Sequence, residues 1–193
     1  MNPLGKTVIA AGLVAFGAAG CLVDETASVR NTSLDSPPLT ASLPDAPEFE
    51  LVSLAGGTLR SADLKGKVVV LDFWATWCAP CKAEIPNYNA LYNEQDPDQV
   101  AMVGVTVESG HIEDVRPFIR ELAIEYPVVM GDDRVTSAFG GIIGYPMVFV
   151  LSPDWRIYKR YFGPVPEDKK GQIERDILEL TSAFGEMALV EVD

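Results

Sequence analysis

A pair of cysteines that closely follows a strongly apolar run is the feature that most limits how this chain can fold. The run covers residues 68–74 (VVVLDFW), and the motif WCAPC occupies residues 77–81. Apolar and β-branched residues in such a run are typical of a buried strand. Proline suits the first turn of a helix, where its missing N–H is not needed. The order of the two segments therefore predicts a strand, a tight turn and a helix that starts at the cysteines.

Two thiols separated by two residues at the start of a helix can close into a disulfide without movement of the backbone, so the spacing indicates redox chemistry. The unpaired N–H groups and the positive end of the helix dipole stabilise a thiolate on Cys78 and make it more reactive. We therefore expect Cys78 to be the attacking thiol and Cys81 the resolving thiol.

The same motif also occurs in structural zinc sites, which need four ligands. The chain has three cysteines and one histidine, and its third cysteine, Cys21, lies in a segment with the character of a targeting signal. We therefore expect no metal site and no organic cofactor, with a redox-active disulfide between Cys78 and Cys81. An inert structural disulfide is a further alternative, although closing so short a loop stabilises a fold little.

The first twenty residues have the pattern of a secretory signal peptide. Lys6 precedes the apolar run 8–16, which is too short to span a membrane, and small residues then lead to Cys21. Residues 18–21 (AAGC) resemble a bacterial lipobox, in which the signal is cleaved before the cysteine and the cysteine is lipid-modified. We predict a lipoprotein anchored through Cys21, while an ordinary cleaved signal and a retained membrane anchor stay open. All three alternatives place the domain outside the cytoplasm, on the periplasmic side.

Composition divides the chain into four segments. We expect a signal peptide at 1–20, a flexible tether rich in proline and serine at 21–46, a folded domain at 47–183 and a tail at 184–193. The formal net charge of −13 argues against nucleic acid as a partner and against electrostatic docking on anionic lipid.

Strand and helix patterns alternate along the folded segment. They predict an α/β fold in which helices flank a central mixed sheet, with an added N-terminal β-hairpin. The expected elements are a hairpin at 49–60, a strand at 68–74, a helix from the cysteines to residue 92 with Pro86 inside it, a strand at 100–107, a helix at 112–126, a strand at 128–130, a helical turn at 135–139, a hairpin at 147–162 and a helix at 167–183.

Three stretches together resemble thioredoxin-fold proteins, and more narrowly the TlpA/ResA family of membrane-tethered thiol–disulfide oxidoreductases. They are residues 64–71 (LKGKVVVL), 72–86 (DFWATWCAPCKAEIP) and 144–146 (GYP), and the resemblance extends over residues 47–183. It implies a thioredoxin-like fold and an extracytoplasmic enzyme that reduces disulfides in other exported proteins. It also implies a membrane thiol reductase as electron donor. Cytochrome c maturation is the family's best-known task and is therefore a candidate role.

The resemblance also assigns roles beyond the two cysteines. Pro146 matches a cis-proline that faces the cysteines and presents the backbone of Tyr145 to an extended substrate segment. Trp77 is expected to lie beside the thiolate and cover one side of it. Asp72 matches the buried aspartate of thioredoxin that helps to deprotonate the resolving thiol, whereas many TlpA-like proteins have asparagine there. Glu84 matches a glutamate near the active site of ResA-like proteins that tunes cysteine acidity and partner recognition, and a merely solvated helix glutamate is the alternative.

Two other functions stay open on the same fold. A copper-binding metallochaperone typically spaces its cysteines further apart and adds a histidine near the cis-proline, and no histidine adjoins Tyr145 or Pro146. A peroxiredoxin-like peroxidase shares the early hairpin but places its catalytic cysteine in a different Pro/Thr context. Titration with Cu(I) and peroxide-dependent thiol consumption distinguish these functions from disulfide reduction.

Overall fold

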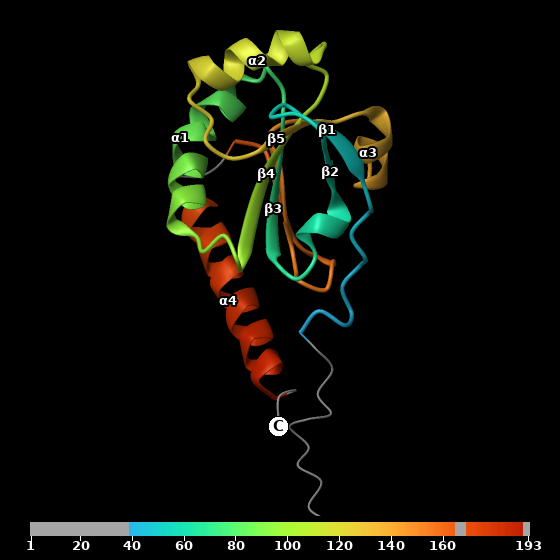
Figure 1. The fold of residues 1–193 in the computed structure, drawn as a ribbon, viewed down its shortest axis with the longest axis vertical. Helices are drawn as coiled ribbons and strands as arrows, with labels where there is room; N and C mark the ends of the chain where they lie inside the picture. The colour runs from blue at the N-terminus through green and yellow to red at the C-terminus, as the bar shows by residue number, and fades with distance from the viewer. Residues whose placement is uncertain (1–38, 165–168, 191–193) are drawn as a thin grey trace, which may run out of the picture. The chain divides into compact units, whose positions relative to one another are not determined.

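A seven-stranded mixed sheet is the centre of the computed structural model, which describes residues 39–164 and 169–190 (Figure 1). The strands are β1 (Glu50–Ser53), β2 (Thr58–Arg60), β3 (Val68–Trp74), β4 (Val100–Thr106), β5 (Val128–Met130), β6 (Met147–Leu151) and β7 (Ile157–Phe162). The helices are α1 (Ala79–Glu94), α2 (Ile112–Glu121), α3 (Asp133–Ala138) and α4 (Lys169–Val190), with a 3₁₀ helix η1 at Ser61–Leu64.

Strand β3 lies inside the sheet, whose order is β2-β1-β5-β4-β3-β6-β7. It pairs parallel to β4 and antiparallel to β6, and all seven of its residues are buried. Burial on both faces explains why its sequence is a continuous apolar run rather than an alternating one. This is the α/β thioredoxin-like fold expected from the sequence, including the N-terminal hairpin formed by β1 and β2.

The two faces of the sheet bury different parts of the chain. Val68, Val70 and Trp74 of β3 share one apolar cluster with both cysteines and with the buried residues of α1 and α4. The alternate residues of β3 pack in a second cluster with Val135 and Phe139, at α3. Figure 1 shows α1 and α4 on one side of the sheet and α3 on the other. Because side chains alternate along a strand, the side chain of Asp72 belongs to the face that carries the cysteines.

Residues 40–46 pack against the turn between β6 and β7, although the sequence placed them in the tether. The Thr40 hydroxyl donates to the carboxylate of Asp154 at 2.6 Å, and the N–H of Ala46 donates to the carbonyl of Trp155. The N–H of Ile157 in turn donates to the carbonyl of Pro44. The packed part of the chain therefore begins earlier than residue 47. The expected signal peptide (1–20), the expected lipidation site Cys21 and residues 22–38 lie outside the described residues.

Two helices end at positions other than those expected. Helix α2 stops at Glu121, not at residue 126, because Leu122 caps it and Ala123 adopts a left-handed conformation with φ of 48°. Helix α4 continues to Val190, so most of the expected tail at 184–193 is helical. Within residues 39–164 and 169–190, no helix combines the length and the apolar character needed to cross a membrane.

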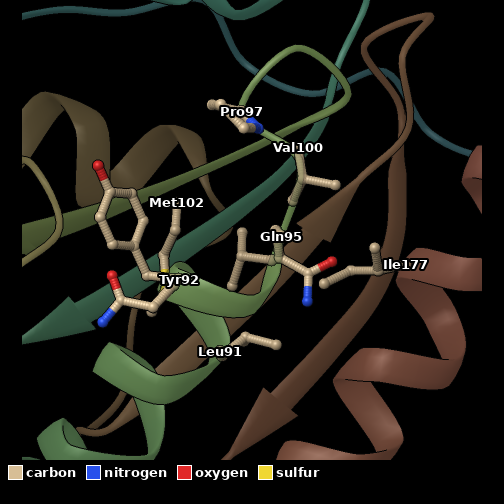
Figure 2. A pocket seen from close by; sticks show the side chains of 9 residues that line it. Leu91, Tyr92, Gln95, Pro97, Val100, Met102 and Ile177 are labelled. Carbon is tan, nitrogen blue, oxygen red and sulfur yellow. The ribbon is translucent and has the colours of Figure 1, made fainter.

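A small cavity of about 200 Å³ lies where the end of α1 meets the start of β4 and helix α4 (Figure 2). Leu91, Val100, Met102 and Ile177 are among the apolar side chains that line it. The cysteines are at the opposite end of α1, which is 16 residues long, so this cavity takes no part in the site described below.

Candidate functional site

Cys78 and Cys81 are joined by a disulfide at the start of α1, as the sequence predicts, with their Cα atoms 5.3 Å apart. Cys78 is the N-cap residue, and its Sγ accepts a hydrogen bond from the N–H of Cys81 at 3.2 Å. Pro80 occupies the first helical turn, where it leaves no hydrogen bond unmade. The helix start thus directs an N–H group and its dipole at the sulfur of Cys78, which favours negative charge there.

An exposed aromatic pair stands beside the disulfide. The Tyr145–Pro146 peptide bond is cis, as expected. The ring of Tyr145 meets that of Trp77 edge to face, with centroids 5.7 Å apart, and 60% of Trp77 is exposed. Glu108 joins the two: its carbonyl accepts the Trp77 Nε1–H at 3.0 Å, and its carboxylate accepts the Tyr145 hydroxyl at 3.2 Å.

This aromatic pair continues into a wider apolar surface. Ile143 and Phe162 are exposed by 86% and 60%, and the Phe162 ring lies against Gly144. The N–H of Gly163 donates to the carbonyl of Pro146, which ties the end of β7 to the same loop. These apolar side chains are exposed close to the cis-proline loop.

Asp72 is only 2% exposed, which excludes the ordinary solvation of a strand-end aspartate. Its Oδ2 receives the hydroxyl of Tyr126 at 3.4 Å, and its Oδ1 has no hydrogen-bond partner among the described residues. The pKa of Asp72 is raised to about 7, chiefly by burial; the charge of Lys169 lowers the pKa, and the charge of Glu84 raises it. A carboxyl group whose pKa lies near neutrality can both accept and release a proton under ordinary conditions.

Glu84 is buried and not merely solvated. It follows Cys81 by one helical turn, and its Oε2 accepts the hydroxyl of Tyr88 at 2.9 Å. The Lys169 Nζ lies 3.5 Å from the same oxygen. The structure therefore places Asp72 and Glu84 on the cysteine-bearing side of the sheet. Trp77, Tyr145 and Pro146 form the exposed rim beside the disulfide.

Sequence patterns alone missed four residues of this site. The Glu84–Tyr88 contact has a local signal, since residues four apart share a helix face. Lys169, Tyr126 and Glu108 have none, because each reaches the site from a distant part of the chain. A lysine at a helix start is ordinarily solvated, yet Lys169 is only 4% exposed.

Comparisons with known proteins agree with this geometry. Residues 44–160 match the family model described as the AhpC/TSA family. The chain is similar to the thiol-disulfide oxidoreductase ResA of Bacillus subtilis strain 168, with 34% identity over 123 residues, which cover 64% of this chain and 68% of that protein.

Solved structures show the same likeness. A thiol:disulfide interchange protein of the thioredoxin family from Chlorobium tepidum TLS superposes with a TM-score of 0.64 at 30% identity, over 72% of this chain and 97% of that one. A second Chlorobium tepidum protein, provisionally named thiol:disulfide interchange protein DsbE, gives a TM-score of 0.65 at 27% identity, over 72% of this chain and 96% of its own.

Proposed function

Because the chain belongs to the AhpC/TSA family and is a thioredoxin-fold thiol–disulfide oxidoreductase like its ResA relatives, we propose that it reduces disulfide bonds in other exported proteins. The observation that carries the proposal is the disulfide at the start of α1, between an exposed apolar rim and a buried carboxyl group. The disulfide itself is the redox group, and the reaction needs no further cofactor.

The reaction proceeds in two exchanges. In the dithiol form, the Cys78 thiolate attacks a client disulfide, a mixed disulfide forms, and one client sulfur leaves as a thiolate. Cys81 then loses its proton to the carboxylate of Asp72, and its sulfur bonds to the Cys78 Sγ. The bond between Cys78 and the client breaks, so that the client leaves fully reduced and the enzyme carries the disulfide. Two electrons pass to the client in total.

The rim beside the disulfide supports the choice of a protein client. Trp77 and Tyr145 provide an apolar wall, and the chain around Pro146 lies beside them, where an extended client segment could pair with the backbone of Tyr145. We assign Trp77, Tyr145 and Pro146 to client binding on this basis.

The site of action and the supply of electrons are parts of the same proposal. The apolar run at 8–16 and the AAGC sequence at 18–21 support export and lipid attachment at Cys21. An extracytoplasmic dithiol must be reduced again after each turnover in an oxidising compartment, so a membrane thiol reductase is the donor that we propose. Apocytochrome c, whose haem-binding cysteines must be reduced, is the candidate client.

Substitution of the two cysteines tests the proposal. Reduction of insulin disulfides should be lost in Cys78→Ser, whereas Cys81→Ser should accumulate a mixed disulfide with exported proteins of the native host, visible as a thiol-sensitive increase in mass. The matched control is Cys78→Ser under the same conditions, which should trap nothing. Capture by Cys78→Ser but not by Cys81→Ser would overturn the assignment of attacker and resolver.

The two alternative functions have their own measurements. A copper-binding role predicts that the reduced domain binds Cu(I) stoichiometrically, and a peroxidase role predicts that peroxide consumes the thiols faster than insulin does. Disulfide reduction predicts the opposite ranking, in which insulin oxidises the thiols faster than peroxide does.

A further inference from the structure

Three charged side chains from three elements are buried on the side of the sheet that carries the cysteines. Asp72 comes from β3, Glu84 from α1 and Lys169 from the first residue of α4, and they are 2%, 9% and 4% exposed. Ionised groups are costly to bury unless they are paired, so such a cluster needs an account of its charges.

Lys169 and two tyrosines contact the two carboxyl groups. The Lys169 Nζ lies 3.5 Å from Glu84 Oε2 and 5.8 Å from the centre of the Tyr88 ring. Tyr88 donates its hydroxyl to the same Glu84 oxygen at 2.9 Å, and Tyr126 donates to Asp72 at 3.4 Å. Helices α1 and α4 thus meet at an ion pair whose α1 member, Glu84, lies one helical turn beyond Cys81.

The charges in this cluster do not balance. One ammonium group faces two carboxyl groups, so the cluster favours a state in which one carboxyl group keeps a proton. Burial lowers the pKa of Lys169, while the charges of Glu84 and Asp72 act in the opposite direction. Asp72 is the carboxyl group that takes up and releases this proton, since its pKa of about 7, raised chiefly by burial, lies near neutrality and its Oδ1 has no partner among the described residues. In its ionised form it can accept the proton of Cys81.

We propose that Lys169 is a positioning residue for the resolving step, in which its buried ammonium group holds Glu84 in place and keeps Asp72 able to accept the proton of Cys81. This inference rests on the proposed function, because the accepted proton is the one that leaves Cys81 when it attacks the mixed disulfide. Lys169 itself does not touch the client or the reacting sulfurs.

The direction of each effect follows from the signs of the charges. The positive charge of Lys169 lowers the pKa of Asp72 and the negative charge of Glu84 raises it. The other titratable groups that face the cluster are Tyr126, which precedes β5, and Tyr88 and Cys81 on α1. Burial raises the pKa of both tyrosines, so they stay protonated throughout the range of the experiment.

Lys169→Met tests the proposal, with Lys169→Arg as the variant that keeps the charge. Lys170→Met is the matched control, because Lys170 is the next residue and pairs instead with Glu94 and Glu174. The first readout is the pH titration of the Asp72 side-chain carbon by NMR in the oxidised protein. The second is the pH dependence of insulin reduction.

Lys169→Met should raise the midpoint of the Asp72 titration by about one pH unit or more, since a close opposite charge lowers a carboxyl pKa by that amount. The pH profile of insulin reduction should shift upward with it. Lys169→Arg should restore both midpoints, and Lys170→Met should change neither. Glu84→Gln should shift the Asp72 titration downward, the opposite sign to Lys169→Met.

An unchanged Asp72 midpoint in folded Lys169→Met would overturn the proposal, as would an equal shift in Lys170→Met. If Lys169→Met does not fold, Lys169→Gln carries the same expectation, because its amide is neutral and can still donate to Glu84. If the wild-type protein does not reduce insulin, that result would count against the proposed function alone. The NMR titration still decides the role of Lys169 in that case.

Discussion

Asp72 carries an energetic cost that depends on pH. Its pKa is 3.8 as an ordinary side chain and about 7 in the folded protein, chiefly because burial disfavours the charged form. Between these two pH values the unfolded chain has released the proton while the folded chain still holds it. The folded state therefore binds more protons, and its stability falls as the pH rises through this window.

Asp72→Asn should remove this pH dependence and slow insulin reduction. The amide cannot ionise, so the variant should be more stable than the wild type at about pH 8, by up to about 4 kcal/mol, because each pH unit between two pKa values is worth about 1.4 kcal/mol. The advantage should disappear below about pH 4, where both side chains are neutral. Urea unfolding of the oxidised proteins at the two pH values measures the difference. An advantage of equal size at both would show that ionisation of Asp72 is not its source.

Cys78 should react with iodoacetamide well before Cys81 in the reduced protein near neutral pH. The two residues are almost equally buried in the disulfide form, so exposure does not separate them. The separation arises from the helix start, where the sulfur of Cys78 accepts the N–H of Cys81 and faces the positive end of α1. Mass spectrometry of peptides after brief alkylation measures the order, and faster labelling of Cys81 would reverse the roles assigned above.

The site residues that the sequence could identify lie within the cysteine motif or within the other stretches that carry the family resemblance. Asp72, Glu84 and the cysteines fall within 13 residues of one another, in a strand, a turn and a helix that local patterns define. Lys169 and Tyr126 could not be identified in this way. Each is an ordinary residue in its own segment and gains its role only when α4 and the chain before β5 pack beneath α1.

At the scale of elements, the pairing of β3 with β4 is as important to the site as the cysteine motif. Asp72 lies opposite Gly104, and the absence of a side chain there leaves room for the rings of Tyr126 and Trp74. A Cβ at this position would come within 2.9 Å of the Tyr126 ring and 3.1 Å of the Trp74 Nε1. The glycine therefore determines where the phenol that contacts Asp72 can lie.

Gly104→Ala should destabilise the fold by about 1–3 kcal/mol, because buried rings cannot move aside without strain. It should also shift the pH profile of insulin reduction, since the Tyr126 hydroxyl is displaced from Asp72. Gly185→Ala is the matched control: nothing lies within 4 Å of the added methyl group, and alanine favours a helix. Thermal unfolding of the two variants provides the comparison. A neutral result at Gly104 would contradict the close packing on which this prediction depends.

The sequence predicted the order and type of the elements better than their ends. Continuous apolar runs identified β3, β4 and β6, since strands buried on both faces leave an unmistakable pattern. The end of α2 depends instead on one left-handed residue, Ala123, which no apolar period reveals. The packing of residues 40–46 is likewise tertiary. It uses backbone groups and the Asp154 side chain of the β6–β7 turn, which is more than 100 residues away in the sequence, so the composition of the segment does not reveal it.

At the scale of the whole molecule, the proposed site of action depends on the N-terminal segment. Cys21→Ala should release the protein from membranes into the soluble extracytoplasmic fraction, or leave the signal uncleaved, because a lipobox cysteine is both the cleavage mark and the point of attachment. Membrane fractionation and intact mass measure the outcome in the native host. Ala19→Ser, two residues before the same cysteine, is a control that should keep the anchor. Unchanged fractionation and mass in Cys21→Ala would exclude lipid attachment there.

The reduction potential of the protein follows from the balance of charge around its disulfide. Strong oxidants owe their high potential to a greatly stabilised thiolate in the reduced form. Here the helix start favours a thiolate on Cys78. The buried carboxyl groups of Asp72 and Glu84 oppose further negative charge on the same side of the sheet, and the single positive charge of Lys169 compensates for only part of the negative charge of these two groups. The residues between the cysteines, Ala79 and Pro80, also resemble the Gly-Pro pair of thioredoxin more than the histidine-bearing pair of strong oxidants.

We therefore expect a potential nearer to that of thioredoxin, about −270 mV, than to the roughly −120 mV of a dedicated oxidant. Equilibration with glutathione buffers, followed by alkylation and mass analysis, measures it. Asp72→Asn should raise the potential, because removing a buried acid lowers the free energy of forming the Cys78 thiolate. Asp98→Asn, on an exposed turn, is the control and should leave the potential unchanged. A wild-type value above about −180 mV would mean that the protein is poised to oxidise its clients and not to reduce them.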